Sequence, residues 1–327
     1  MDWPSGAPDG GAANGSPTGA PRGAPDVVVF GSLNLDHVVT VEELPKPGQT
    51  VGGSSYISVP GGKGLNQAVA ASRQGARVAM VACAGEDAPG GLLLGVLSRE
   101  AIVSGGVRRA VAAPTGTALI TVARGGANTI VVAAGANGEL GAADVEAARE
   151  VLTVRTVVLA QLEIPLPAVG AALHLSRERG SRAVLNPSPV EAGFSPELLE
   201  LVDVLVPNEG EALAISGRAT VEQAADWFLG HGCGAVAITL GEAGALVAQP
   251  GRSTVHVRAF SVDAVDTTAA GDAFCGALAA ALAGGHDLLE AAKRGCAAGA
   301  LAATVLGAVP SLPSKEAVDR ILSGQVE

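Results

Sequence analysis

The sequence predicts an α/β fold in which helices cover both faces of a mainly parallel central sheet, with a small β-sheet attached as a lid. Two observations predict it. Short, valine-rich apolar runs alternate with amphipathic helical stretches, which is the order of parallel strands joined by crossover helices. Two further stretches are β-prone but are joined by Gly or Pro turns, as in hairpins. At 48% hydrophobic but only 2% aromatic residues, the chain must fill its core with Ala, Val and Leu.

The expected strands of the central sheet are apolar nearly throughout, as strands buried on both faces are. They span residues 27–33, 78–85, 156–163, 183–188, 203–209 and 235–241. Expected helices lie between or after them, over residues 65–75, 144–152, 167–180 and 221–232. The lid strands are expected in about 37–59 and 115–134, each too short to be a domain of its own.

Composition limits the domain organisation and the class of partner. Residues 1–25 are mostly Gly, Pro, Ala and small polar residues, which predicts a disordered tail, and residues 26–327 form one domain. A formal charge of −11 without a run of Lys or Arg argues against nucleic acid or a membrane as partner. The tail lacks a signal-peptide pattern, and the four cysteines form no CxxC pair. We therefore expect a soluble cytoplasmic protein with buried thiols and no His/Cys metal site.

Polar residues follow several of the expected strands. Ligands of open parallel sheets bind beyond the carboxyl ends of the strands, so these positions predict a shared functional rim. Ordinary turns are the alternative, but a turn does not require Glu163, or Asn208 together with Glu211. The stretches concerned are "GSLNLD", "QLE", "NPS", "PNEGE" and "TLGEAG".

A glycine-rich turn, "PGGKGLNQAVA", spans residues 60–70 and opens directly into a helix. Its glycines permit positive φ and a close approach of the backbone to a ligand. It is not a Walker A loop, because the first glycine of that motif is missing and Gly64 stands where Ser or Thr is needed. A plain turn with an exposed Lys63 is one interpretation. The other is a loop around a polar ligand, with Asn66 pointing back towards it.

A second motif, "DTTAAGD", spans residues 266–272 and precedes an alanine-rich helix. Small residues leave the N–H groups at the start of that helix open to an anion such as phosphate, which the helix dipole also favours. Asp272 could simply cap the helix. Beside such a pocket it could instead accept a proton from a hydroxyl group during phosphoryl transfer.

The two motifs together resemble the signatures of the ribokinase (PfkB-type) carbohydrate kinases, and the resemblance runs from about Val27 to the C-terminus. The stretches "GSLNLDHV", "AGAN", "QLEIP", "LNPSP", "VPNEGEA" and "ITLGEAG" are similar to those of the ribose-phosphorylating members. The resemblance implies a ribokinase-like fold and ATP-dependent phosphorylation of D-ribose at O5. It leaves open other sugars or nucleosides (deoxyribose, fructose, a ketodeoxy sugar acid) and a catalytically silent sugar-binding protein.

The resemblance also implies residue roles. Asp272 would be the general base, beside an anion hole formed by the amides of residues 269–272, namely Ala269, Ala270, Gly271 and Asp272 itself. The implied sugar-binding positions are Asn34, Asp36, Gly62, Lys63, Asn66, Glu163 and Asp272. The implied ATP-binding positions are Asn208, Thr239, Leu240, Gly241, Glu242, Ala243, Gly244, Gly271 and Cys296. Cys296 stands where the family usually has Asn or His near the adenine, which leaves recognition of the base open.

Two cations and a partner complete what the resemblance implies. Glu211 would hold Mg²⁺ through water, within the N-x-x-E motif that begins at Asn208. Potassium would bind at Asp266, Thr268, Ala302, Val305, Gly307 and Ser311, mostly through backbone carbonyls. The exposed edges of the lid, which proteins usually cover, favour the homodimer that this family forms through its lid.

Overall fold

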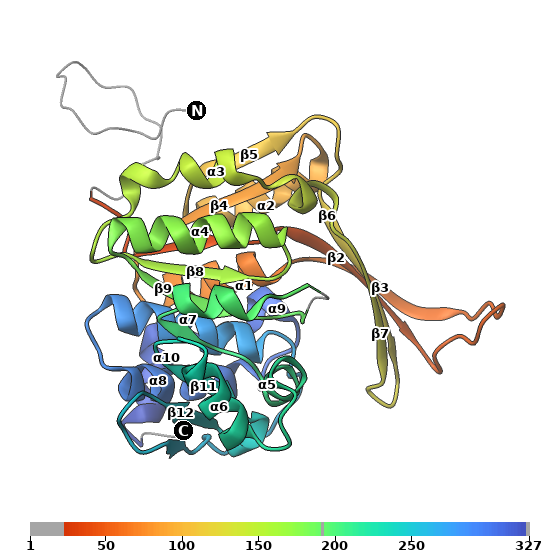
Figure 1. Ribbon diagram of the computed structural model, residues 1–327. Coiled ribbons are helices and arrows are strands. Elements are labelled where there is room, and N and C mark those ends of the chain that lie inside the picture. The colour runs from red at the N-terminus through yellow and green to blue at the C-terminus, as the bar shows by residue number, and fades with distance from the viewer. Residues whose placement is uncertain (1–22, 191–192, 325–327) are drawn as a thin grey trace.

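The computed structural model describes residues 23–190 and 193–324, and their strands form two sheets (Figure 1). The larger has nine strands in the order β13-β12-β11-β10-β9-β8-β1-β4-β5. Neighbours from β11 to β5 pair in parallel, and β12 and β13 are antiparallel at one edge. The predicted, mainly parallel sheet is confirmed. Its strands are β1 (Val27–Phe30), β4 (Val78–Gly85), β5 (Val103–Ala110), β8 (Val157–Gln161), β9 (Arg182–Asn186), β10 (Val204–Leu205), β11 (Val236–Thr239), β12 (Ala245–Ala248) and β13 (Val255–Val257).

Helices cover both faces of this sheet because alternate strand residues point to opposite sides. Val27 and Val29 of β1 belong to the apolar cluster that contains α1, α7 and α8. Val28 and Phe30 belong to the cluster that contains α4 and α6. The α-helices are α1 (Lys63–Arg73), α2 (Ala88–Arg99), α3 (Ala142–Glu146), α4 (Leu166–Arg179), α5 (Glu209–Ser216), α6 (Val221–Gly230), α7 (Ala270–Ala283), α8 (Leu288–Ala302), α9 (Ala308–Ser311) and α10 (Lys315–Leu322). The 3₁₀ turns are η1 (Gly135–Glu139), η2 (Arg149–Val151), η3 (Pro196–Leu201) and η4 (Gly241–Ala243).

The small sheet has the strand order β3-β2-β6-β7 and projects sideways from the body of the molecule (Figure 1). The chain enters it directly from β1, so the small sheet begins where the first strand of the main sheet ends. Every residue of β7 is exposed. The strands are β2 (Asn34–Val41), β3 (Gly53–Gly61), β6 (Gly116–Ala123) and β7 (Asn128–Ala133).

Two predicted elements differ from the structure. The strand expected over 203–209 ends at Leu205, because Pro207 has no N–H to donate and Asn208 already caps α5. The helix expected over 144–152 is divided into α3 and the 3₁₀ turn η2. An ion pair links Glu146, the last residue of α3, to Arg149, the first residue of η2. Eight of the described α-helices and strands were not located from the sequence, namely α2, α5, α8, α9, α10, β5, β12 and β13.

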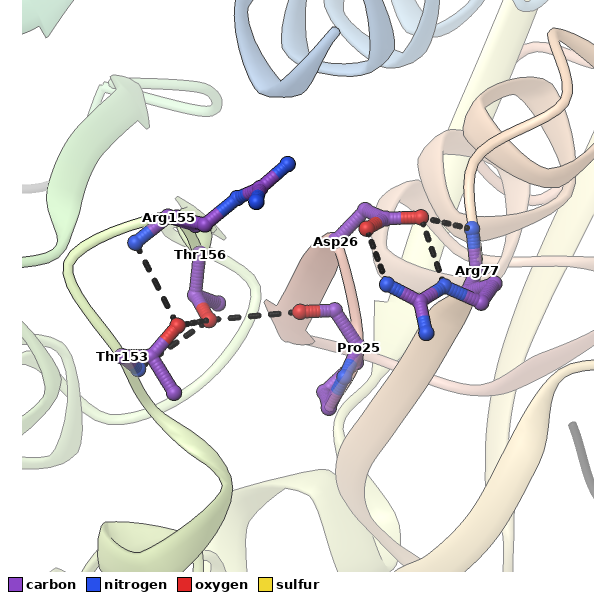
Figure 2. Close-up of polar contacts among 6 residues, drawn as sticks. All are labelled: Pro25, Asp26, Arg77, Thr153, Arg155 and Thr156. Carbon is purple, nitrogen blue, oxygen red and sulfur yellow. Dashed lines mark hydrogen bonds and ion pairs between the residues drawn. The ribbon is translucent and has the colours of Figure 1, made fainter. Parts of the chain in front are cut away.

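The described chain begins beside the amino end of β1 (Figure 2). Asp26 accepts from the guanidinium of Arg77 at 2.6 and 3.0 Å, and the hydroxyl of Thr156 donates to the Pro25 carbonyl at 3.2 Å. These contacts attach the start of β1 to its two neighbours, β4 and β8. Most of the predicted tail, residues 1–22, lies outside the described residues. Among the described helices, none has the length and apolarity needed to cross a bilayer.

Candidate active site

The close crossing of α1 and α7 creates the centre of the site. A Cβ added at Gly276 would collide with the Cβ of Ala70 and the carbonyl of Gln67, so only glycine lets the two helices approach this closely. Asp272 lies one helical turn before Gly276 and therefore on the same face of α7. The crossing thus directs the Asp272 carboxylate at the first turns of α1.

Both oxygens of the buried Asp272 carboxylate accept hydrogen bonds from α1. Asn66 Nδ2 donates to Oδ2 at 2.9 Å, and Gln67 Nε2 donates to Oδ1 at 2.9 Å. Gln67 is fully buried and Asp272 is 7% exposed. The side-chain oxygen of Asn66, Oδ1, is also buried but has no partner within the described residues. Asp272 therefore does not act as a simple N-cap: its side chain faces another helix rather than its own amides.

The glycine loop places Lys63 at the start of α1. Gly62 is the N-cap of α1 with φ 93°, a left-handed conformation that glycine adopts without strain. The loop is attached to the carboxyl end of β8 by Glu163, whose Oε2 accepts from the Lys63 N–H at 2.9 Å and from the Ser32 hydroxyl at 2.5 Å. Two of the sequence motifs therefore meet at one carboxylate.

The start of β2 brings Asn34 and Asp36 to the same region. A Cβ added at Gly61 would collide with the Asp36 carboxylate, so the glycine loop lies directly against it. The side-chain amide of Asn137 accepts from the Leu33 N–H at 2.9 Å and donates to the Asn34 side chain at 2.7 Å. We call the set of side chains around the glycine loop the polar cluster; it consists of Asn34, Asp36, Lys63, Asn66, Glu163 and Asp272.

The polar cluster concentrates negative charge around one lysine. Burial raises the pKa of Asp272, although Lys63 and the amide donors on α1 oppose this effect. Burial, with the charges of Glu163 and Asp272, raises the pKa of Asp36 from 3.8 to about 7. Burial alone would lower the pKa of Lys63, but Asp272, Glu163 and Glu211 outweigh it and hold that pKa above its usual range. The cluster can therefore stabilise a cation or a ligand rich in hydroxyl groups.

A cavity of about 680 Å³, the α7 pocket, opens on the other side of the α7 N-terminus. It is bounded by η4, the loop over residues 259–264, and the facing parts of α7 and α8. Of the implied ATP-binding positions, the pocket is lined by Thr239, Gly241, Glu242, Ala243, Gly244, Gly271 and Cys296. Leu240 and Asn208 are not among its lining residues, although Asn208 forms a bridge with Thr239. Burial raises the pKa of Cys296 to about 12, so its thiol stays protonated.

The first turn of α7 contributes to both the α7 pocket and the polar cluster, and several of its amides are open. Ala269 has φ 60°, a left-handed conformation that is rare for a residue other than glycine and is found at functional sites. The Ala270 N–H donates to the Thr267 carbonyl at 3.2 Å. Within the described residues, the N–H groups of Ala269, Gly271 and Asp272 have no acceptor. Open amides at a helix N-terminus suit an anion.

Asn208 and Glu211 form a reciprocal capping box at the start of α5. Glu211 Oε2 accepts from the Asn208 N–H at 2.9 Å, and the Asn208 side chain accepts from the Glu211 N–H at 2.8 Å. The second carboxylate oxygen of Glu211 remains available. The charge of Glu211 is near enough to contribute to the raised pKa of Lys63. A hard oxygen of this kind fits a water-mediated contact with Mg²⁺.

Asp266 joins the loop before α7 to the segment after α8. Its carboxylate accepts from the Thr268 N–H at 2.9 Å and from the Gly307 N–H at 2.8 Å. These bonds bring three of the six implied potassium positions together. Ala302 and Val305 are linked by a backbone bond of 3.2 Å, and the Ser311 hydroxyl donates to the Ala308 carbonyl instead. The oxygen-only donor set fits a hard monovalent cation.

Comparison with known proteins assigns this chain to a family. A profile described as pfkB family carbohydrate kinase matches residues 24–315. The chain belongs to that family. It is 39% identical over 295 residues to a ribokinase of Haemophilus influenzae, covering 89% of this chain and 96% of that protein. The predicted family and fold class are confirmed, and the protein is a carbohydrate kinase.

Solved structures of pfkB-type kinases have the same fold. The ribokinase of Thermotoga maritima matches with a TM-score of 0.84 at 37% identity, covering 91% of this chain and 99% of that one. The ribokinase of Arabidopsis thaliana, solved in complex with ribose and ATP, also matches with a TM-score of 0.84, at 31% identity and the same coverage. The likeness therefore includes the main sheet and extends over nearly the whole chain.

Sequence analysis gave no role to three buried amides near Asp272. Gln67 lies inside the glycine motif, and Gln161 and Asn186 lie in the predicted rim at the ends of β8 and β9. Their signal is a polar side chain at a position where the surrounding pattern is apolar. Periodicity alone does not show which such side chains will meet, because that depends on how closely α1 and α7 cross.

Proposed function

We propose that this protein transfers the γ-phosphoryl group of ATP to O5 of D-ribose, giving D-ribose 5-phosphate and ADP. The observation that carries the proposal is the position of Asp272, buried between the polar cluster on one side and the α7 pocket with its open amides on the other. The ribokinases among its relatives, one of them solved with ribose and ATP, support ribose as the sugar.

In the proposed reaction, Asp272 takes the proton of the 5-hydroxyl while O5 attacks the γ-phosphorus. The bond between that phosphorus and the β,γ-bridging oxygen breaks, and ADP leaves with the electron pair. Open amides at the start of α7 stabilise the negative charge of the transferring group without having to reorient. Asp272 then releases its proton to solvent with the product.

On the sugar side, the polar cluster supplies donors and acceptors for the hydroxyl groups of ribose. Asn34, Asp36 and Glu163 accept from hydroxyls, Lys63 and Asn66 donate to them, and Gly62 lets the loop approach the sugar. The unpartnered carbonyl of Asn66 is a further acceptor that a hydroxyl would satisfy. Lys63 is the only cation among the cluster's six defined members, which favours a neutral sugar over a sugar phosphate.

On the nucleotide side, ATP would occupy the α7 pocket with its phosphates at the amides of residues 269–272. Asn208 and residues 239–244 would bind the nucleotide, with Cys296 near the adenine. Glu211 would hold Mg²⁺ through water, and Mg²⁺ supplies charge neutralisation of the phosphates when bound. Potassium would bind at Asp266 and Thr268 with the segment from Ala302 to Ser311.

The small sheet would close over the sugar and pair with a second copy of the chain. It exposes apolar side chains on both faces, with Tyr56, Leu119 and Val131 on one and Ile57 and Ile130 on the other, each at least half exposed. Exposed apolar side chains that gather in this way mark interaction sites. Light scattering on a size-exclusion column should give the mass of a dimer. The four cysteines are free and buried, which suits a reducing compartment such as the cytoplasm.

A panel of sugars tests the proposed substrate. Wild-type protein is assayed by coupled ADP release with ribose, deoxyribose, fructose, a ketodeoxy sugar acid and a nucleoside at equal concentrations, with and without potassium. We expect ribose to be turned over fastest and potassium to raise the rate. Faster turnover of another sugar would replace ribose as the substrate, and ribose binding by calorimetry without ADP formation would indicate a binding protein.

A further inference from the structure

A series of buried side-chain amides, which we call the amide chain, leads from the main sheet to the carboxylate of Asp272. Gln67 Nε2 donates to Asn186 Oδ1 at 3.0 Å as well as to Asp272 Oδ1 at 2.9 Å. Gln67 Oε1 accepts from Gln161 Nε2 at 2.6 Å. Asn186 Nδ2 donates to the backbone carbonyl of Val206 at 2.7 Å. This amide chain therefore joins β8, β9, α1 and α7 through buried side chains.

The direction of every bond in this chain is set at one end. The Val206 carbonyl can only accept, so the nitrogen of the Asn186 amide must face it and the oxygen must face Gln67. Gln67 must then present its NH₂ group to Asn186, and the second hydrogen of that group points at Asp272 Oδ1. If the Gln67 amide were reversed, its oxygen would face two acceptors. Gln67 is thus locked as a donor to Asp272 Oδ1.

Asn66, the donor to the other oxygen, is not locked in this way. Its side-chain oxygen has no partner within the described residues, so rotation of the amide breaks no second bond within the protein. After rotation, the Asn66 oxygen could accept from a protonated Asp272 Oδ2. A proton on Oδ1 would instead face the fixed N–H of Gln67, donor against donor. The two oxygens of Asp272 therefore differ in their ability to hold a proton.

We propose that Gln67 is a positioning residue that anchors Oδ1 of Asp272, so that Oδ2 is the oxygen that takes the proton of the sugar hydroxyl. The inference rests on the proposed function, because it requires that Asp272 be the base. In the reaction the O–H bond of the sugar breaks and an O–H bond to Asp272 Oδ2 forms, while Gln67 keeps both of its hydrogens. Gln67 is fully buried, so it acts through Asp272 and not by touching a substrate.

The test compares two variants of the same buried chain. Gln67→Met removes the anchor at nearly constant volume, and Gln161→Met removes the neighbouring amide, which does not touch Asp272. Both lose a buried hydrogen bond, so both should lower the melting temperature. Only Gln67→Met should lower kcat, by about 10- to 100-fold as the base loses its alignment, with the KM for ribose changed less than about three-fold.

The pH dependence of kcat separates positioning from a structural role. A hydrogen bond to the charged form of a carboxylate lowers its pKa, so removing the Gln67 donor should raise the pKa of Asp272. The acid limb of the kcat profile should then move to higher pH in Gln67→Met and stay in place in Gln161→Met. If Gln67→Met does not fold, Gln67→Asn takes its place. That variant keeps an amide, but its side chain is too short to reach both Asn186 and Asp272.

Two results would overturn the inference. One is a Gln67 variant with wild-type kcat. The other is an equal loss of kcat in both variants with no displacement of the acid limb, which would make the amide chain purely structural. A wild-type protein that phosphorylates no sugar at all would instead refute the proposed function and, with it, this inference.

Discussion

The two sides of the α7 N-terminus are built differently. On the sugar side, charged and amide side chains are buried and already bonded to one another, as Asp272, Asn66 and Gln67 are. On the nucleotide side, the α7 pocket is lined mainly by small residues and by backbone, with a protonated thiol at Cys296. With the proposed roles, this difference means that the base is held in place before substrates arrive, whereas the nucleotide would be selected mainly by shape and by main-chain groups.

Removal of Asp272, the proposed base, should have the largest effect on activity. We expect Asp272→Ala to lower kcat by about 10²- to 10⁴-fold, because the 5-hydroxyl loses its proton acceptor. Ribose binding, measured by calorimetry, should largely remain, since the other members of the polar cluster are unchanged. The measurement is steady-state ADP release at saturating ribose and ATP.

A matched control distinguishes a base from a helix cap. Asp287 caps α8 by accepting from the Glu290 N–H at 2.9 Å, so Asp287→Ala should cost about 1 kcal/mol of stability and leave kcat unchanged. If Asp272→Ala behaved in the same way, keeping more than about a tenth of the wild-type kcat, then Asp272 would not be the general base.

On the nucleotide side, one added methyl group should impair binding without harming the fold. A Cβ at Gly271 would meet no protein atom within 4 Å, and Gly271 does not have positive φ. Gly271→Ala should therefore fold normally but place a methyl group where the phosphates are expected, lowering kcat/KM for ATP by about 10-fold or more. The KM for ribose should change little.

The control is the same substitution in a remote helix. Gly91 in α2 also has open space around its Cβ position and is exposed, so Gly91→Ala should leave both kcat/KM values unchanged. Equal kinetics for Gly271→Ala and wild type would mean that the phosphates do not lie against the start of α7.

This contrast also explains how much could be predicted from the sequence. The alternation of strands and helices predicted the main sheet, and side-chain chemistry pointed to Asp272, Lys63 and Glu163, because carboxylates and a lysine at strand ends and glycine turns are unusual. The small residues of "DTTAAGD" also predicted open amides at the start of α7. The ATP-binding role of the pocket wall was predicted only through the family resemblance, because that wall consists mostly of small residues without distinctive side-chain chemistry. Gln67 was missed because its partners become neighbours only when Gly276 allows α7 to approach α1.

The smallest expected effect is on the free energy of unfolding of the ligand-free protein, and it comes from Asp36 in the polar cluster. Asp36 has a pKa of about 7 in the fold against 3.8 as its ordinary value, so the folded state keeps a proton that the unfolded chain has already lost. Its contribution to stability is full below pH 3.8 and is lost as pH rises towards 7. The Asp36→Asn variant has no carboxylate to charge at this position, so its stability should not fall for this reason as pH rises.

Urea denaturation of the ligand-free protein at several pH values measures the effect. Between pH 5 and 8, the free energy of unfolding of Asp36→Asn should rise relative to wild type by about 1 to 3 kcal/mol, whereas the exposed-site control Asp226→Asn should give no such trend. Parallel curves for Asp36→Asn and wild type would show that neither burial nor the neighbouring carboxylates disfavour the charge of Asp36 in the empty site.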